Sequence, residues 1–185
     1  MEITFYRKLA NKVAEAVIAN AEYSEAEARR IRYGLVCIFS DLYKFLLLLL
    51  IFTLFSSALE YLLAFAVMLL LRPILGGYHA KSELVCLAVS FITMAVNVFA
   101  GKMNIIPGFV QITLLIVLTI AGAVIAPVRT RKVEERTGIY KTLAAALTPA
   151  LLLLDYFCIP GQVVQVSVVT IYLLSVYQLL KNKSF

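Results

Sequence analysis

The residues best suited to chemistry lie in one short stretch, Arg72 to Cys86, which reads RPILGGYHAKSELVC. It contains His79, the only histidine of the chain, and places Cys86 seven positions later. An imidazole beside a cysteine increases the fraction of thiolate, and the thiolate is the form of the side chain that attacks a carbonyl. The two side chains therefore predict a cysteine–histidine dyad.

Helix geometry restricts where His79 can lie. On one continuous helix, seven residues would place both side chains on the same face but about 10 Å apart along the axis, too far for a hydrogen bond. A working pair needs His79 on a loop that folds back towards Cys86, and Pro73 with Gly76 and Gly77 would allow such a turn. If the next helix begins just before Cys86, its dipole favours a thiolate there and its free amides favour an oxyanion.

The same residues also fit a structural interpretation, in which His79 is an interfacial polar side chain and Cys86 a small buried apolar one. Composition and spacing alone favour this interpretation, because buried free cysteines are common and inert. A metal site is weaker still, since one histidine and one cysteine do not make a ligand set, and no cofactor is expected. Cys37 and Cys158 are expected to be packing residues, and three cysteines predict no disulfide framework.

The elements that must position this stretch are membrane-spanning helices. Of the 185 residues, 62% are hydrophobic and 15% are charged, and the mean hydropathy is +0.92. A soluble domain is about 45–50% apolar and about 25% charged, and a disordered chain is less apolar still. The sequence predicts an all-α polytopic membrane protein with one membrane-embedded domain over residues 1–185. The six spans are expected at about 33–55, 58–71, 84–100, 109–126, 140–154 and 163–180.

A further helix is expected at the N-terminus, over residues 1–22. Apolar residues recur there at near-helical spacing among charged ones, which is typical of an amphipathic helix lying on the membrane surface. Ser24 and Glu27 have the spacing of a capping box and predict the start of the helix that leads into the first span.

The basic residues predict the orientation of the spans. All except Lys44 and Lys102 fall in the N-terminal segment, the loop after the second span, the region after the fourth span, or the C-terminal tail. Six spans place these four segments on one side, and the positive-inside rule makes that side the cytoplasm. We therefore expect a multi-pass protein of the cell membrane with both termini in the cytoplasm. The net charge of +6 then reflects topology, and nucleic acid is not an expected partner.

Two carboxylates are candidates to orient His79. Asp41 lies about 12 Å into the first expected span. An ionised group there costs about 2.5–3.5 kcal/mol and needs a partner. Lys44, three residues later, is the nearest one, and a local ion pair is favoured over the orienting role. Glu83 lies close in sequence to both dyad residues, but it fits equally well as a cap of the third span.

A family resemblance adds to these observations. The stretch resembles the signature of the accessory gene regulator B (AgrB) family, membrane-embedded cysteine endopeptidases of Gram-positive quorum-sensing systems. The matching residues are Arg72, Gly76, Gly77, His79, Ala80 and Cys86. The resemblance extends over essentially the whole chain, through the basic amphipathic N-terminus, Tyr33–Gly34 at the first span, and the basic loop after Ala126–Pro127.

The resemblance implies a role for each matching residue. Cys86 would be the nucleophile, and His79 the general base and acid. Arg72 and Gly77 match positions that the family needs for activity. The family's basic cluster, which binds or supports substrate, is matched by Arg129, Arg131 and Lys132.

The resemblance also implies a substrate, a small AgrD-like propeptide with an amphipathic leader and an acidic C-terminal tail. Cleavage through a Cys86 thioester would let a cysteine or serine of the peptide close a thiolactone or lactone ring. The residues themselves leave two other functions open: a peptide exporter or helper subunit without enzymatic activity, and an adaptor whose basic loops bind anionic lipid. A homodimer is compatible with the small size of the bundle.

Overall fold

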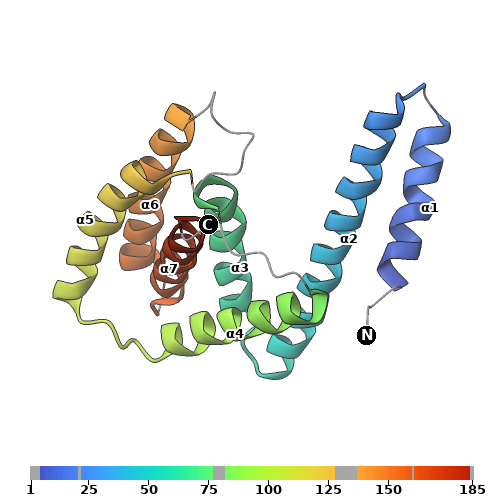
Figure 1. Ribbon diagram of the computed structural model, residues 1–185. Coiled ribbons are helices and arrows are strands. Elements are labelled where there is room, and N and C mark those ends of the chain that lie inside the picture. Colours follow the sequence, from blue (N-terminus) through green and yellow to red (C-terminus); the bar gives the residue numbers. More distant parts are fainter. Residues whose placement is uncertain (1–4, 21, 77–81, 128–136, 160, 184–185) are drawn as a thin grey trace.

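The structure is a computed structural model that describes residues 5–20, 22–76, 82–127, 137–159 and 161–183. Throughout this part of the chain the regular elements are helices, which confirms the all-α prediction (Figure 1). The seven are α1 (Phe5–Ala19), α2 (Glu25–Leu54), α3 (Ala58–Leu75), α4 (Glu83–Lys102), α5 (Gly108–Ile125), α6 (Thr137–Cys158) and α7 (Val163–Lys183). Six of them, α2 to α7, are long and apolar enough to cross a membrane. The chain is therefore a multi-pass membrane protein.

The N-terminal helix α1 packs antiparallel along the first half of α2 (Figure 1). Its buried residues are Tyr6, Ala10 and Ala14, which recur every four positions and so form one narrow face. The Tyr6 ring stacks on that of Tyr43 in α2, with centroids 6.0 Å apart. The apolar residues outside this face, such as Phe5, stay exposed, so α1 keeps a second apolar surface available for lipid.

The capping box predicted at the start of α2 is confirmed. The Ser24 hydroxyl accepts a hydrogen bond from the backbone N–H of Glu27 at 3.4 Å, and the Glu27 carboxylate accepts the Ser24 N–H at 2.9 Å. From this cap the helix runs without interruption to Leu54. It is longer than the expected span because it begins eight residues before residue 33.

The end of α3 differs from the prediction. Pro73 lies inside the helix and does not begin a turn, and α3 continues to Leu75, beyond the expected end at residue 71. The chain leaves the helix at Gly76, whose φ of 86° lies in the left-handed region that favours glycine. The Gly76 N–H still donates to the Arg72 carbonyl at 2.8 Å. Glycine, and not proline, therefore ends this helix.

Two apolar clusters hold the helices together, and α3 belongs to both. The first joins α3 to α5, α6 and α7. The second joins α3 to α2 and α4 around Phe52, Tyr61 and Met94. Polar contacts support the same packing: Thr170 of α7 donates to the Asn97 side chain of α4 at 2.8 Å, as expected for an interhelical hydrogen bond.

The cysteines outside the predicted dyad lie on the outer surface. Cys37 and Cys158 are both exposed, so the packing role expected for them is wrong. The outer surface of the helices is apolar in a membrane protein because it faces lipid, and a thiol fits there as well as in a core. Sequence hydropathy cannot distinguish these two apolar environments.

The start of α7 is held by groups from two other helices. The buried carboxylate of Asp155 in α6 accepts the backbone N–H of Val164 at 3.2 Å, which satisfies an amide that the first turn of a helix leaves free. The carbonyl of Gly101 in α4 accepts the N–H of Gln162 at 2.9 Å. At Gly101 the absence of a side chain lets α4 approach Val163 closely.

Replacing Gly101 by alanine is expected to destabilise the protein by about 1–3 kcal/mol, the usual cost of overpacking. The added Cβ would lie 2.5 Å from the Cα of Val163, so backbone must move. The matched control is Gly34→Ala, because a Cβ on Gly34 has no neighbour within 4 Å. The control should leave stability unchanged or raise it slightly. Thermal unfolding in detergent measures both, and equal midpoints for the two variants would contradict the packing at Gly101.

Candidate active site

Cys86 lies in the first turns of α4, which begins at Glu83, one residue before the expected span. Its backbone N–H donates to the Ser82 carbonyl at 2.9 Å, and Ser82 is the N-cap of the helix. The side chain is half-buried, unlike those of Cys37 and Cys158. A thiolate at this place is favoured by the positive end of the helix dipole.

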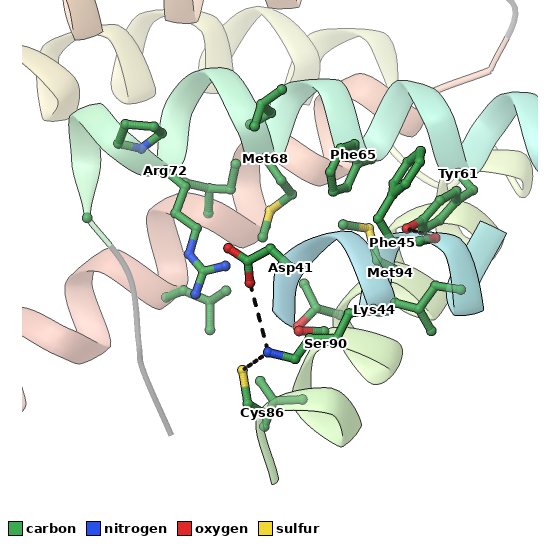
Figure 2. A pocket seen from close by; sticks show the side chains of 18 residues that line it. Asp41, Lys44, Phe45, Tyr61, Phe65, Met68, Arg72, Cys86, Ser90 and Met94 are labelled. Atoms are coloured by element: carbon green, nitrogen blue, oxygen red, sulfur yellow. Dashed lines mark hydrogen bonds and ion pairs between the residues drawn. The ribbon is translucent and has the colours of Figure 1, made fainter. Parts of the chain in front are cut away.

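The thiol opens into a cavity of about 380 Å³ between α2, α3, α4 and α7 (Figure 2). Most of the wall is apolar, with three aromatic rings and two methionines: Phe45, Tyr61, Phe65, Met68 and Met94. Polar side chains gather at the end that holds the thiol, namely Asp41, Lys44, Arg72 and Ser90. The cavity therefore offers an apolar chamber beside a charged entrance and a potential nucleophile.

A lysine of α2 contacts the thiol directly. The Lys44 ammonium donates to Cys86 Sγ at 3.6 Å and lies 3.9 Å from a carboxylate oxygen of Asp41 (Figure 2). The local Asp41–Lys44 ion pair is thus confirmed. The two partners differ in environment, because the Asp41 side chain is 80% exposed and that of Lys44 only 12%.

Arg72 extends from the last turn of α3 into the same cavity, beside Asp41 (Figure 2). Gly76, which ends that helix, also lines the cavity. The structure therefore brings together Cys86, Asp41, Arg72 and Gly76. Other predicted site residues lie outside the described residues, and their roles stay predictions: Gly77, His79, Arg129, Arg131 and Lys132.

Glu83 has a partner that the sequence did not indicate. Its carboxylate forms an ion pair with Arg7 of α1 at 3.1 Å, which ties the first helix to the start of α4. The two residues are 76 positions apart, and no local pattern relates them. An orienting role for Glu83 or Asp41 towards His79 stays a prediction.

The contact between Lys44 and Cys86 was also missed, although a signal existed. A lysine within an apolar span is costly, and such residues commonly mark functional sites. Spacing along the first expected span pairs Lys44 with Asp41. Such spacing indicates neighbours on the same helix and gives no information about residues on another helix. Among the described residues, no group of three histidine, cysteine, aspartate or glutamate side chains is placed to hold a metal ion.

If the cavity binds the peptide substrate expected from the sequence, Ser90→Phe should lower cleavage of that substrate about 10–100-fold, which corresponds to about 1.4–2.8 kcal/mol of binding. Ser90 lies one helical turn after Cys86 and lines the cavity, so a ring there would occupy space that the substrate needs. The control, Ile92→Phe, places the same ring on the exposed side of α4. Cleavage assays with purified protein compare the two variants. Equal rates would show that the cavity is not part of the substrate-binding site.

Comparison with known proteins identifies the family. The model of accessory gene regulator B matches residues 7–180, which include α2 to α6, nearly all of α7 and the cysteine at the cavity. The chain belongs to the AgrB family. Membership supports a role in the processing of quorum-sensing peptides.

Individual AgrB relatives match over shorter stretches. Protein FsrB of Enterococcus faecalis (strain ATCC 47077 / OG1RF) is 34% identical over 71 residues, which is 38% of this chain and 29% of FsrB. A putative AgrB-like protein of Clostridium beijerinckii is 34% identical over 73 residues, 40% of this chain and 37% of the relative. These matches span well under two thirds of either relative. No solved structure matches the chain significantly.

Proposed function

We propose that this AgrB family member is a membrane-embedded cysteine endopeptidase that removes the C-terminal tail of an AgrD-like propeptide. The observation that carries the proposal is the position of Cys86. It is the one cysteine of the chain that lines the cavity, at a helix N-terminus and 3.6 Å from an ammonium group. Family membership supports the peptide substrate, and the position of the thiol supports the type of reaction.

In the proposed mechanism, Cys86 attacks the carbonyl at the C-terminal boundary of the signal region. His79 takes the thiol proton and returns it to the departing amine, so that the tail leaves as a free peptide. The acyl-enzyme is a thioester, which keeps the carbonyl reactive. A cysteine or serine within the bound peptide then displaces Cys86 and closes a thiolactone or lactone, and its proton returns to the Cys86 sulfur by way of His79.

The apolar chamber supports this order of events. Phe45, Tyr61 and Phe65 form a wall suited to an apolar side chain next to the scissile bond. Such a wall also limits the access of water, and so favours attack by the peptide over hydrolysis of the thioester. Arg72 lies at the charged entrance, where a cation would attract the acidic tail, with the basic residues 129–136 as a second expected contact.

The orientation proposed for the site is cytoplasmic, with both termini on the same side. One end of the bundle is marked by the ion pair between Arg7, near the basic N-terminus, and Glu83, the first residue of α4. At the other end, Lys102 of α4 pairs with Glu60 at 3.0 Å. The concentration of basic residues in the N-terminal segment supports a cytoplasmic position for the first end, in a Gram-positive cell, under the positive-inside rule. A homodimer is part of the same proposal.

A covalent adduct tests the proposal directly. The protein is incubated in nanodiscs with a synthetic propeptide, quenched in acid, digested and analysed by mass spectrometry. A thioester predicts a hydroxylamine-sensitive adduct of the signal region on Cys86, with release of the free tail. A peptide exporter or helper subunit instead predicts intact propeptide and no adduct on any of the three cysteines, and that result would reject the peptidase.

A further inference from the structure

A lysine ammonium in a membrane-spanning helix needs a counter-charge. Lys44 lies 19 residues after the start of α2, and its side chain is 88% buried. Its ion-pair partner on the same helix, Asp41, is 80% exposed and 3.9 Å away, at the limit of an ion pair. At that separation the carboxylate only partly offsets the charge of the ammonium. The better shielded contact of the ammonium is the Cys86 sulfur, at 3.6 Å.

We infer that Lys44 is a further catalytic residue of the proposed peptidase, in which its ammonium is the charge partner of the Cys86 thiolate. The inference rests on the proposed function, because only a nucleophilic cysteine needs such a partner. The Lys44 N–H donates to the thiolate before attack, and no proton passes through Lys44, so it complements a general base and does not replace one.

The other charged groups around the thiol are less suited than Lys44 to pair with the Cys86 thiolate. Arg72 lines the same cavity from α3, beside Asp41 (Figure 2). On the thiol's own helix, Glu83 is negative and is bound to Arg7 of α1. The residues that α7 adds to the cavity are the apolar Ile171 and Leu174. Lys44 is therefore the cation that the described structure places in hydrogen-bonding contact with Sγ.

The geometry also explains why the partner comes from a different helix. Lys44 and Cys86 are 42 residues apart, on α2 and α4. The two helices meet in the cluster around Phe52 and Met94, which fixes the height of Lys44 relative to the first turns of α4. The long, flexible lysine side chain can then move with the sulfur during attack. A side chain on α4 itself would stay at the surface of the helix that carries Cys86.

The test is the pH dependence of alkylation at Cys86, which needs no substrate. Wild type, Lys44→Met and Lys44→Arg are treated with iodoacetamide in nanodiscs from pH 5 to pH 10, and each cysteine is followed by mass spectrometry. We expect Lys44→Met to lower the rate at Cys86 about tenfold at neutral pH and to move its profile about one unit upwards. Lys44→Arg should restore most of the rate. Cys37 and Cys158, both exposed, are internal references that should not change.

Two further variants serve as controls for the Lys44 comparison. Lys102→Met removes a lysine from the opposite end of the same bundle and should leave the Cys86 profile unchanged. Lys44→Gln keeps a polar side chain, and it replaces Lys44→Met in the comparison if the methionine variant does not fold. An unchanged Cys86 profile in a folded Lys44 variant would overturn the inference while leaving the peptidase intact. Normal cleavage by Cys86→Ala would instead overturn the peptidase, whatever Lys44 does to alkylation.

Discussion

Replacement of Cys86 by alanine is expected to reduce propeptide cleavage to the detection limit, a loss of at least about 10⁴-fold. The reason is that no thioester can form, and removal of the nucleophile costs about 10⁶-fold in serine proteases of known mechanism. The cavity and the helix start should persist, because the side chain is half-buried and alanine retains its Cβ. Co-expression with a propeptide, followed by mass spectrometry of cells and medium, measures the result as accumulated full-length peptide.

The chain supplies two matched controls for this experiment. Cys37→Ala and Cys158→Ala remove the same thiol from exposed positions that line no described cavity, and both should cleave at the wild-type rate. Loss of activity in these controls would indicate a general effect of cysteine removal. A Cys86→Ala variant that still releases the tail would exclude the nucleophilic role, and the exporter would become the better interpretation.

Replacement of His79 by alanine is expected to lower cleavage about 10²–10⁴-fold, the usual contribution of a general acid–base group. Three residues of extended chain span at most about 11 Å. His79 is three residues from Gly76, which lines the cavity, and three from Ser82, the cap of the helix that carries Cys86. A histidine tethered on both sides at these lengths has the reach to place its imidazole near the sulfur.

Rates measured from pH 5 to pH 9 separate a chemical role of His79 from a structural one. Wild type should lose activity at low pH as the imidazole becomes protonated, and His79→Ala should lack that loss. Added imidazole should partly restore the variant. Cleavage by His79→Ala at the wild-type rate, with the same pH dependence, would mean that another group transfers the proton.

The helices were predictable because hydrophobic blocks of membrane length, capping residues and glycine are local signals. The Ser24–Glu27 capping box rests on a spacing of three residues, and α4 begins one residue before the apolar block expected at 84–100. Helix ends were less accurate: α3 continues two residues beyond Pro73, although that proline removes one backbone hydrogen bond of the last turns, and the helix ends only at Gly76. Local sequence does not indicate how far a helix continues past such a proline.

The contacts that build the site were not predictable, because they join distant parts of the chain. Lys44 meets Cys86 from 42 residues away, and Arg7 meets Glu83 from 76. Composition identifies such groups as costly in a membrane, but only the packing of α2 against α3 and α4 determines which of them meet. The nucleophilic role of Cys86 stays a prediction that rests on a family signature, since spacing alone favoured a structural cysteine.

The size of the cavity has a consequence for how a peptide would be recognised. At about 380 Å³ it lies near the lower end of pockets that hold drug-sized ligands, so it accommodates only the few residues around a scissile bond. The rest of a propeptide would then lie along the outside of the helices and on the bilayer surface. The lipid then acts as a second binding site that raises the effective concentration of the peptide at Cys86. Affinity measured in detergent would miss this contribution, and a short peptide without its leader would be a poor substrate even with every contact at the thiol intact.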